Sequence, residues 1–134
     1  MGESFPETAQ SRLSVLTRDL GFRLAAQDEH HIRLESVAMA VEAWHDPRGE
    51  LDVRVSRLDS ADRNAEWRYT GMVGTASIAR LLEIAVEQIT ADPAILSGDQ
   101  AFYDELAAEN RGLSEAWTAY YSGKGPQPTG KLPP

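Results

Sequence analysis

The chain of 134 residues contains no cysteine, and this absence excludes disulfide bonds, thiol catalysis and thiolate metal sites together. It also lacks any run of about eighteen apolar residues, the length that a membrane-spanning helix requires. The first residues, MGESFPETAQSRL, include acidic side chains where a secretory signal peptide needs a basic and then an apolar segment. We therefore expect a cytoplasmic protein that does not enter a membrane.

Positive charge is also scarce. The 13 Lys and Arg residues stand against 21 Asp and Glu residues, which gives a formal net charge of −8. Residues 75–121 are the most acidic stretch, because only Arg80 and Arg111 balance its carboxylates. A nucleic-acid-binding surface needs clustered basic side chains that neutralise phosphates, so nucleic acid is not an expected partner. An acidic surface instead favours association with a basic protein.

The rest of the composition is typical of a globular domain. Hydrophobic residues make up 42% of the chain and charged residues 25%, and this length is sufficient for one core. We expect a single α+β domain over residues 1–121. Residues 122–134 are rich in Pro and Gly, which predicts a flexible tail.

The clearest pattern in the sequence lies between Val37 and Leu58 and is typical of two half-buried β-strands. Apolar residues recur there at every second position: Val37, Met39, Val41, Ala43, Leu51, Val53 and Val55. The turn between the two strands contains Pro47, Arg48 and Gly49.

The length of this turn decides which side chains share a face. A two-residue loop, Pro47-Arg48, would place Trp44 opposite Leu51 and contradict the alternation. A three-residue loop that ends in Gly49 restores it, since proline suits the first corner of a type I turn and glycine the left-handed position that follows. The resulting pairs are His45 with Leu51, Ala43 with Val53, Val41 with Val55, Glu42 with Arg54 and Trp44 with Asp52. We therefore predict that Trp44 faces solvent and that His45 faces the helices.

Other patterns predict the remaining elements. A helix is expected from Phe5 to Leu20, with Ser4 as its N-cap and Gly21 as its C-terminal stop. Strands are expected over 22–26, 31–35 and 66–70, with a bulge or corner at Ser36-Val37, and helices over 75–90, 100–109 and 114–121. The predicted fold is α+β: an N-terminal helix, an antiparallel meander of four or five strands, and three C-terminal helices packed on one sheet face. Four aromatic residues have the spacing of core positions: Trp67, Tyr69, Trp117 and Tyr120.

Catalytic and metal-binding patterns are not present. His30 and His31 are adjacent and point to opposite faces of an extended chain, and His45 lies on another strand, so we expect neither a metal site nor a cofactor. The outer-face carboxylates, such as Glu42 and Glu66, lie beside arginines, which favours solvated ion pairs over a general acid–base pair.

The segment Gly71-Met72-Val73-Gly74 allows two interpretations. It lies between a predicted strand and a predicted helix, so the free N–H groups over 75–77 could hold an anion. The alternative is a flexible strand-to-helix joint with Thr75 as the N-cap, and the absence of a phosphate-loop spacing favours this alternative.

Trp44 is the main candidate for a binding residue. The alternation places it on the outer face with Ala38 and Ala40, next to Glu42 and Arg54, and an outward Trp beside small residues forms a flat apolar patch. Such a patch indicates a protein partner or self-association. In the alternative interpretation, the indole lies on neighbouring Arg side chains.

Three turn and cap segments resemble a pattern in small uncharacterised bacterial α+β proteins. These segments are Leu20-Gly21-Phe22, Leu34-Glu35-Ser36 and Asp46-Pro47-Arg48-Gly49-Glu50, and the resemblance covers about residues 10–70. Some of those proteins are thought to be immunity proteins of toxin–antitoxin-like secretion systems. The resemblance implies a binding role and assigns no functional residue.

The function that these observations favour is that of a non-enzymatic binding protein, which sequesters or regulates a protein partner as an immunity protein or regulatory subunit would. The alternative is a small-ligand-binding domain or minor enzyme with a pocket between sheet and helices, lined by His45, Tyr69 and Trp67. A homo-oligomer joined through the Trp44 face is a third hypothesis.

Overall fold

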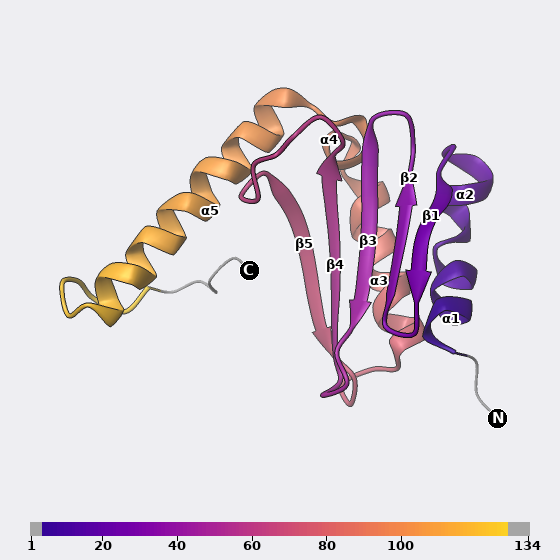
Figure 1. Cartoon of the computed structure of the whole chain (residues 1–134), viewed down its shortest axis with the longest axis horizontal. Helices are drawn as coiled ribbons and strands as arrows, with labels where there is room; N and C mark the ends of the chain where they lie inside the picture. Colours follow the sequence, from indigo (N-terminus) through magenta and orange to yellow (C-terminus); the bar gives the residue numbers. More distant parts are fainter. Residues whose placement is uncertain (1–3, 129–134) are drawn as a thin grey trace.

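The computed structural model describes residues 4–128 and has the predicted α+β architecture (Figure 1). Two short helices, α1 (Phe5–Arg12) and α2 (Ser14–Asp19), precede five strands: β1 (Arg23–Asp28), β2 (His31–Glu35), β3 (Met39–His45), β4 (Glu50–Arg57) and β5 (Glu66–Met72). Three helices follow: α3 (Ile78–Ala91), α4 (Pro93–Ser97) and α5 (Gln100–Tyr121). The strands form one antiparallel sheet in the order β1-β2-β3-β4-β5, which confirms the predicted meander.

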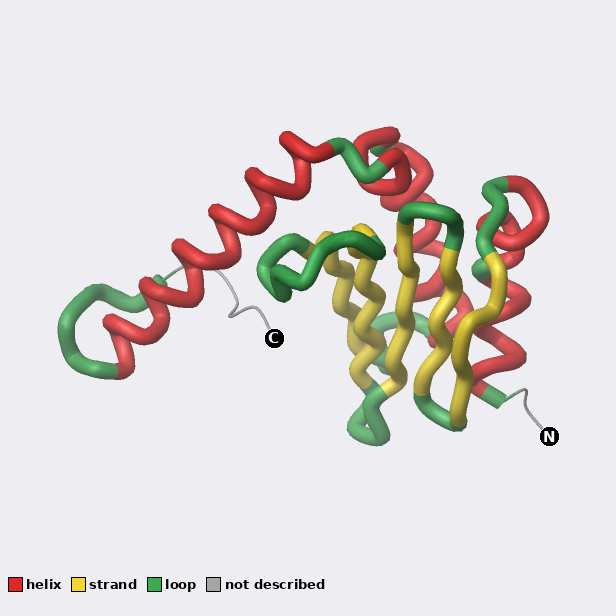
Figure 2. The backbone as a smooth tube through the Cα atoms, turned by 45° about the horizontal axis from the view of Figure 1, so that its top comes forward, coloured by secondary structure: helices red, strands yellow, loops and turns green. Residues whose placement is uncertain are grey.

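The core lies between the sheet and the helices that cover one of its faces. Figure 1 shows the sheet from its uncovered side, with α3 behind the strands, and Figure 2 shows the same arrangement obliquely. Side chains of α2, of the junction between α1 and α2, of α3 and of strands β2 to β4 meet in this core, among them Leu13, Leu16, Ile32, Leu34, Val41, Val53, Leu82, Ala85 and Ile89. Trp67 and Tyr69 pack against it from β5, as their spacing predicts.

The N-terminal helix is divided at Leu13, where the prediction has one helix from Phe5 to Leu20. The N–H of Leu16 bonds to the carbonyl of Leu13 at 3.0 Å, so the chain tightens there into a three-residue turn. The predicted caps are confirmed. The Glu7 N–H donates to Ser4 Oγ at 3.3 Å, and Gly21 ends α2 with φ +75°.

The register of the β3–β4 hairpin is confirmed in full. His45 lies opposite Leu51, and Trp44 lies opposite Asp52. Gly49 has φ +98°, and its N–H closes the turn on the Asp46 carbonyl at 2.8 Å. Because the side chains alternate from this turn, His45 points to the helical side, where its ring centroid lies 5.6 Å from that of Phe5 in α1.

The chain begins β3 two residues later than the alternation indicates. Residues 36–38 form the turn from β2 to β3, and the Ser36 N–H bonds to the Met39 carbonyl at 2.9 Å. Val37 is therefore 100% exposed and does not belong to the strand. The change of parity at Ser36-Val37 marks this turn, whereas the bulge of the sheet lies in β1 between Leu24 and Ala26.

The C-terminal helices differ from the prediction at two boundaries. Ser77, and not Thr75, caps α3, because Ser77 Oγ accepts the Arg80 N–H at 3.2 Å while the Thr75 hydroxyl donates to the Met72 carbonyl. The two helices predicted over 100–109 and 114–121 are one continuous α5. Gly112 lies inside it, and the cost of a helical glycine, about 1 kcal/mol relative to alanine, does not end the helix.

Only the first half of α5 is anchored in the domain. Its buried residues are Tyr103 and Ala107, and beyond them the helix extends away from the sheet past β5 (Figure 1). Tyr120, predicted for the core, is 36% exposed, and Trp117 is not part of the core either. The helix ends in a glycine cap in which the Gly123 N–H bonds to Tyr120 and the Lys124 N–H to Ala119. The predicted tail, 122–134, starts with this cap, and its residues 129–134 lie outside the described part.

Candidate functional site

The uncovered side of the sheet, which we call the outer face, carries side chains in rows across the strands. Its members come from four strands: His31, Arg33, Glu42, Trp44, Asp52, Arg54, Glu66 and Arg68. The register places Arg33, Glu42, Arg54 and Arg68 in one row and His31, Trp44, Asp52 and Thr70 in the next. The arginines of these rows lie within reach of the carboxylates Glu42 and Asp52, although Arg54 and Arg68 are themselves direct neighbours.

Trp44 is held between a histidine and an arginine. The His31 ring stacks on the indole with centroids 4.8 Å apart, and Arg54 Cζ lies 4.7 Å from the ring centroid. A guanidinium over an indole is a favourable cation–π contact. The interpretation in which the indole lies on Arg side chains therefore describes Trp44 better than the one in which it belongs to an apolar patch.

The flat apolar patch around Trp44 is a prediction that the structure corrects. Ala40 lies on the outer face but is only 1% exposed, between Glu35 of β2 and Ser56 of β4. Ala38 is exposed but lies in the β2–β3 turn, at the far end of the strand that carries Trp44. Ala38 and Trp44 are six residues apart in the chain, which corresponds to about 20 Å along an extended strand. Of the predicted contact residues, Trp44, Glu42 and Arg54 lie together, and the two alanines do not extend their surface.

Asp52 is the most buried charged residue of the outer face. It is 9% exposed, and its Oδ2 accepts hydrogen bonds from Arg54 Nη2 at 2.9 Å and from Arg68 Nη2 at 2.7 Å. Arg54 and Arg68 are direct neighbours in the register, so their like charges would repel without a carboxylate between them. Asp52 therefore fixes both guanidinium groups, including the one over Trp44.

Glu42 has the same role on the other side of Trp44. Its Oε2 lies 2.7 Å from His31 Nε2, and its Oε1 accepts from Arg33 Nη1 at 2.6 Å. The Glu42 side chain is only 19% exposed, which strengthens both contacts relative to surface pairs. Glu42 thus holds the His31 ring that stacks on Trp44, as Asp52 holds the Arg54 guanidinium over the same indole.

Glu66 is a carboxylate of the outer face whose ionisation is disfavoured. Burial raises its pKa, and the attraction of Arg54 and Arg68 opposes this only in part. A raised pKa in the folded state contributes stability at low pH, and this contribution is lost as the pH rises through the folded-state value. The wild type should therefore lose stability relative to Glu66→Gln as the pH rises above the ordinary carboxyl pKa. The difference in stability between the two proteins should become constant once the pH has passed the pKa of Glu66 in the folded state.

Urea unfolding of both proteins between about pH 4 and pH 8 measures this difference. Glu115→Gln, at an exposed position of α5, serves as the control for the loss of one carboxylate. A wild type that instead gains stability over Glu66→Gln as the pH rises would contradict the assignment.

Two shallow hollows adjoin Trp44. One, of about 500 Å³, lies beside the β3–β4 turn and is lined by Trp44, His45, Asp46, Glu50, Asp52 and Arg54 among others. The other, of about 410 Å³, is lined by Trp44 and the β1–β2 turn: Asp28, Glu29, His30 and His31. Both turns lie at the lower end of the sheet in Figure 1. The indole therefore forms a wall common to the two hollows.

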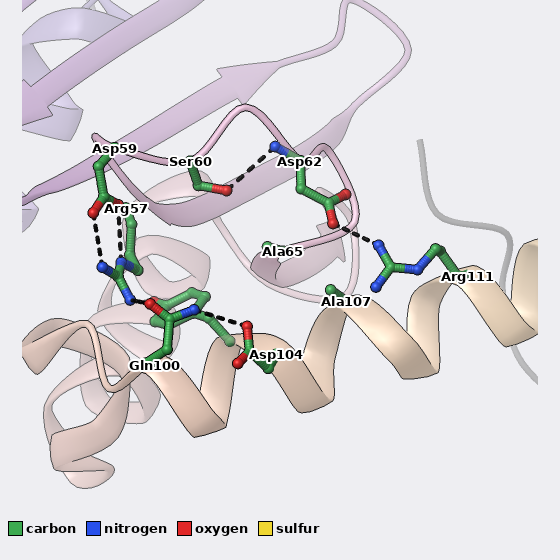
Figure 3. A pocket seen from close by; sticks show the side chains of 10 residues that line it. Arg57, Asp59, Ser60, Asp62, Ala65, Gln100, Asp104, Ala107 and Arg111 are labelled. Atoms are coloured by element: carbon green, nitrogen blue, oxygen red, sulfur yellow. Dashed lines mark hydrogen bonds and ion pairs between the residues drawn. The ribbon is translucent and has the colours of Figure 1, made fainter.

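A third hollow, of about 300 Å³, lies between the β4–β5 loop and the first half of α5. Figure 3 shows its polar side chains bonded to one another: Arg57 donates to Asp59 at 2.8 and 3.0 Å and to Gln100, and Arg111 donates to Asp62 at 2.5 Å. No pattern in the sequence predicts this cleft, because its two walls are far apart in the chain.

Two carboxylates of this cleft, Asp59 and Asp62, have a lowered pKa. Hydrogen bonds from the Asn64 N–H and, second in size, from Arg111 lower the pKa of Asp62, and a hydrogen bond from Arg57 lowers that of Asp59.

The three residues predicted to line a ligand pocket between the sheet and the helices do not lie around one pocket. Trp67 and Tyr69 pack against the core, and His45 lines the hollow beside Trp44 instead.

Within residues 4–128, no group of three or more His, Asp or Glu side chains is arranged to hold a metal ion. None of the helices described there combines the length and the apolar character that crossing a bilayer requires.

Compared with known proteins, the chain matches no family model, no curated protein and no solved structure. What the protein does must therefore be argued from its own surfaces.

Proposed function

We propose that this protein is a non-enzymatic binding protein that sequesters or regulates a protein partner, as an immunity protein or a regulatory subunit does. The contact surface in this proposal is the outer face around Trp44. The observation that carries it is the position of the indole, which is fixed by His31 and Arg54 on a sheet face that α1 and α3 leave uncovered.

The energetics of interfaces support this choice of surface. Tryptophan and arginine contribute most often to the few contacts that dominate protein–protein binding. Binding is stronger when the contact residues lose little freedom, and here Asp52 holds Arg54 and Glu42 holds His31 before any partner arrives. The polar side chains of the outer face bind one another. This arrangement suits a preformed binding surface better than it suits a catalytic site that transfers protons.

Affinity capture with the full chain tests the proposal. Extracts of the source organism are passed over immobilised wild type, Trp44→Ala and Tyr121→Ala, where Tyr121 is an aromatic residue that is 70% exposed at the end of α5. We expect one protein to be enriched on the wild type and on Tyr121→Ala and to be reduced at least tenfold on Trp44→Ala.

Two results would contradict the proposal. One is equal capture by the wild type and Trp44→Ala, and the other is recovery of background proteins alone from all three columns. Light scattering on the wild type and Trp44→Ala measures their oligomeric state and so tests the third hypothesis, self-association. A dimer that dissociates only in Trp44→Ala would make a second copy of the chain the partner.

Small-ligand binding is a second candidate function, favoured by the cleft in Figure 3. Its volume suits a small polar molecule. A ligand there would have to compete with the arginines that already bind Asp59 and Asp62. The fixed indole of the outer face needs no such exchange before it can contact a partner. Protein binding through the outer face is therefore our first proposal.

A further inference from the structure

We infer that the end of the outer face around Trp44 accepts a lysine- or arginine-bearing segment of a protein partner. This inference rests on the proposed function and adds the chemistry of the partner. The surface consists of the two hollows on either side of the indole, at the β1–β2 and β3–β4 turns.

Charge is the first reason. The two hollows are lined by five carboxylates, Asp28, Glu29, Asp46, Glu50 and Asp52, against one guanidinium, that of Arg54. The remaining lining groups that can ionise are three histidines. Negative potential in a concave surface attracts cations and suppresses acidic partners.

The availability of the carboxylates is the second reason. The Glu29 side chain is 93% exposed, and it lies 4.0 Å from the ring of His30, which is charged only when protonated. Glu50 is exposed and forms no ion pair within the described residues. Asp46 pairs with Arg48, whose side chain is 89% exposed and easily displaced. Two of the five carboxylates thus remain open to a partner's ammonium or guanidinium group, and a third opens at low cost.

The shape of the surface is the third reason. Lysine and arginine combine an apolar stem with a charged head, and they bind best where an apolar wall adjoins negative charge. The edge of the Trp44 ring provides that wall to both hollows, while His31 and Arg54 occupy its faces. A segment that crosses the indole edge could place one basic side chain in each hollow.

The test uses a synthetic peptide of about eight residues, rich in Lys and Arg and free of aromatic residues, at low salt. Calorimetry measures its affinity for the wild type and for two double variants with the same change in charge. Glu29→Lys/Glu50→Lys alters the hollows, and Glu105→Lys/Glu115→Lys alters exposed positions of α5. We expect the first variant to lose at least tenfold in affinity and the second to stay within about threefold of the wild type.

A backbone amide NMR map of the wild type with the same peptide does not depend on any variant. Shifts confined to residues 28–31 and 44–52, with the Trp44 indole N–H among them, support the inference. Equal loss in both double variants, shifts spread over the acidic helices, or no binding would overturn it. Capture of a partner that does not respond to Glu29→Lys/Glu50→Lys would leave the proposed function standing and remove this inference alone.

Discussion

Replacing Tyr103 with alanine should lower the free energy of unfolding by about 4 kcal/mol, the range for truncating a buried aromatic side chain. Tyr103 is 1% exposed and is one of only two buried residues in α5. Its hydroxyl donates to the Ile95 carbonyl at 2.6 Å, so the variant loses a buried hydrogen bond as well as packing. Burial raises the pKa of Tyr103 well above its usual value, so the hydroxyl remains a donor throughout the working pH range.

Tyr121→Ala is the matched control, because it removes the same side chain from the exposed end of the same helix. It should cost less than about 1 kcal/mol. Tyr103→Phe separates the hydrogen bond from the packing and should cost about 1–2 kcal/mol, since the Ile95 carbonyl keeps its burial and loses its donor. Urea unfolding measures all three. A Tyr103→Ala variant no weaker than Tyr121→Ala would mean that Tyr103 does not anchor α5.

The features that the sequence predicts correctly are local ones. The β3–β4 register follows from alternation and from the preference of Gly49 for positive φ, and both act within about twenty residues. The N-cap at Ser4 and the stop at Gly21 follow from the same kind of short-range chemistry. The meander follows because consecutive strands that are joined by short loops usually pair as antiparallel neighbours.

The features that it misses depend on neighbours from other strands. Ala40 is buried although its alternation places it on the outer face, because the strands β2 and β4 flank it on both sides with Glu35 and Ser56. The alternation along one strand does not show how far the neighbouring strands cover a small side chain. His31 lies on Trp44 only because the chain turns at 36–38. A turn at 36–38 pairs His31 with Trp44, so the change of parity at Ser36-Val37 is the feature of the sequence that indicates this contact.

The helix α5 shows the limit of single glycines as boundary signals. Gly112 suggests a break, yet the apolar positions 106, 113 and 120 keep one phase through it. The cleft in Figure 3 joins residues 57–65 to residues 100–111, and no local pattern connects them. Such long-range contacts decide the candidate sites, whereas local chemistry decides the elements.

The second large effect is expected at Asp52. Asp52→Asn keeps the shape of the side chain but leaves Arg54 and Arg68 side by side without the carboxylate that they bind. Breaking a fully buried pair costs about 3–5 kcal/mol and a surface pair about 0–1 kcal/mol. Both Arg side chains are 24% exposed, so we expect an intermediate loss of about 2 kcal/mol. Urea unfolding at low and high salt measures it.

Asp59→Asn provides the comparison, because Asp59 also binds one arginine through two oxygens but is 69% exposed in its side chain. It should cost much less than Asp52→Asn, and salt should remove most of that cost, because the Asp59–Arg57 pair is screened by solvent. Adding Arg68→Gln to Asp52→Asn should cost less than the two single changes together, since one substitution removes the repulsion that the other creates. If Asp52→Asn and Asp59→Asn cost the same, the outer face is an ordinary solvated surface. The indole of Trp44 would then lose the fixed guanidinium that makes it a preformed contact.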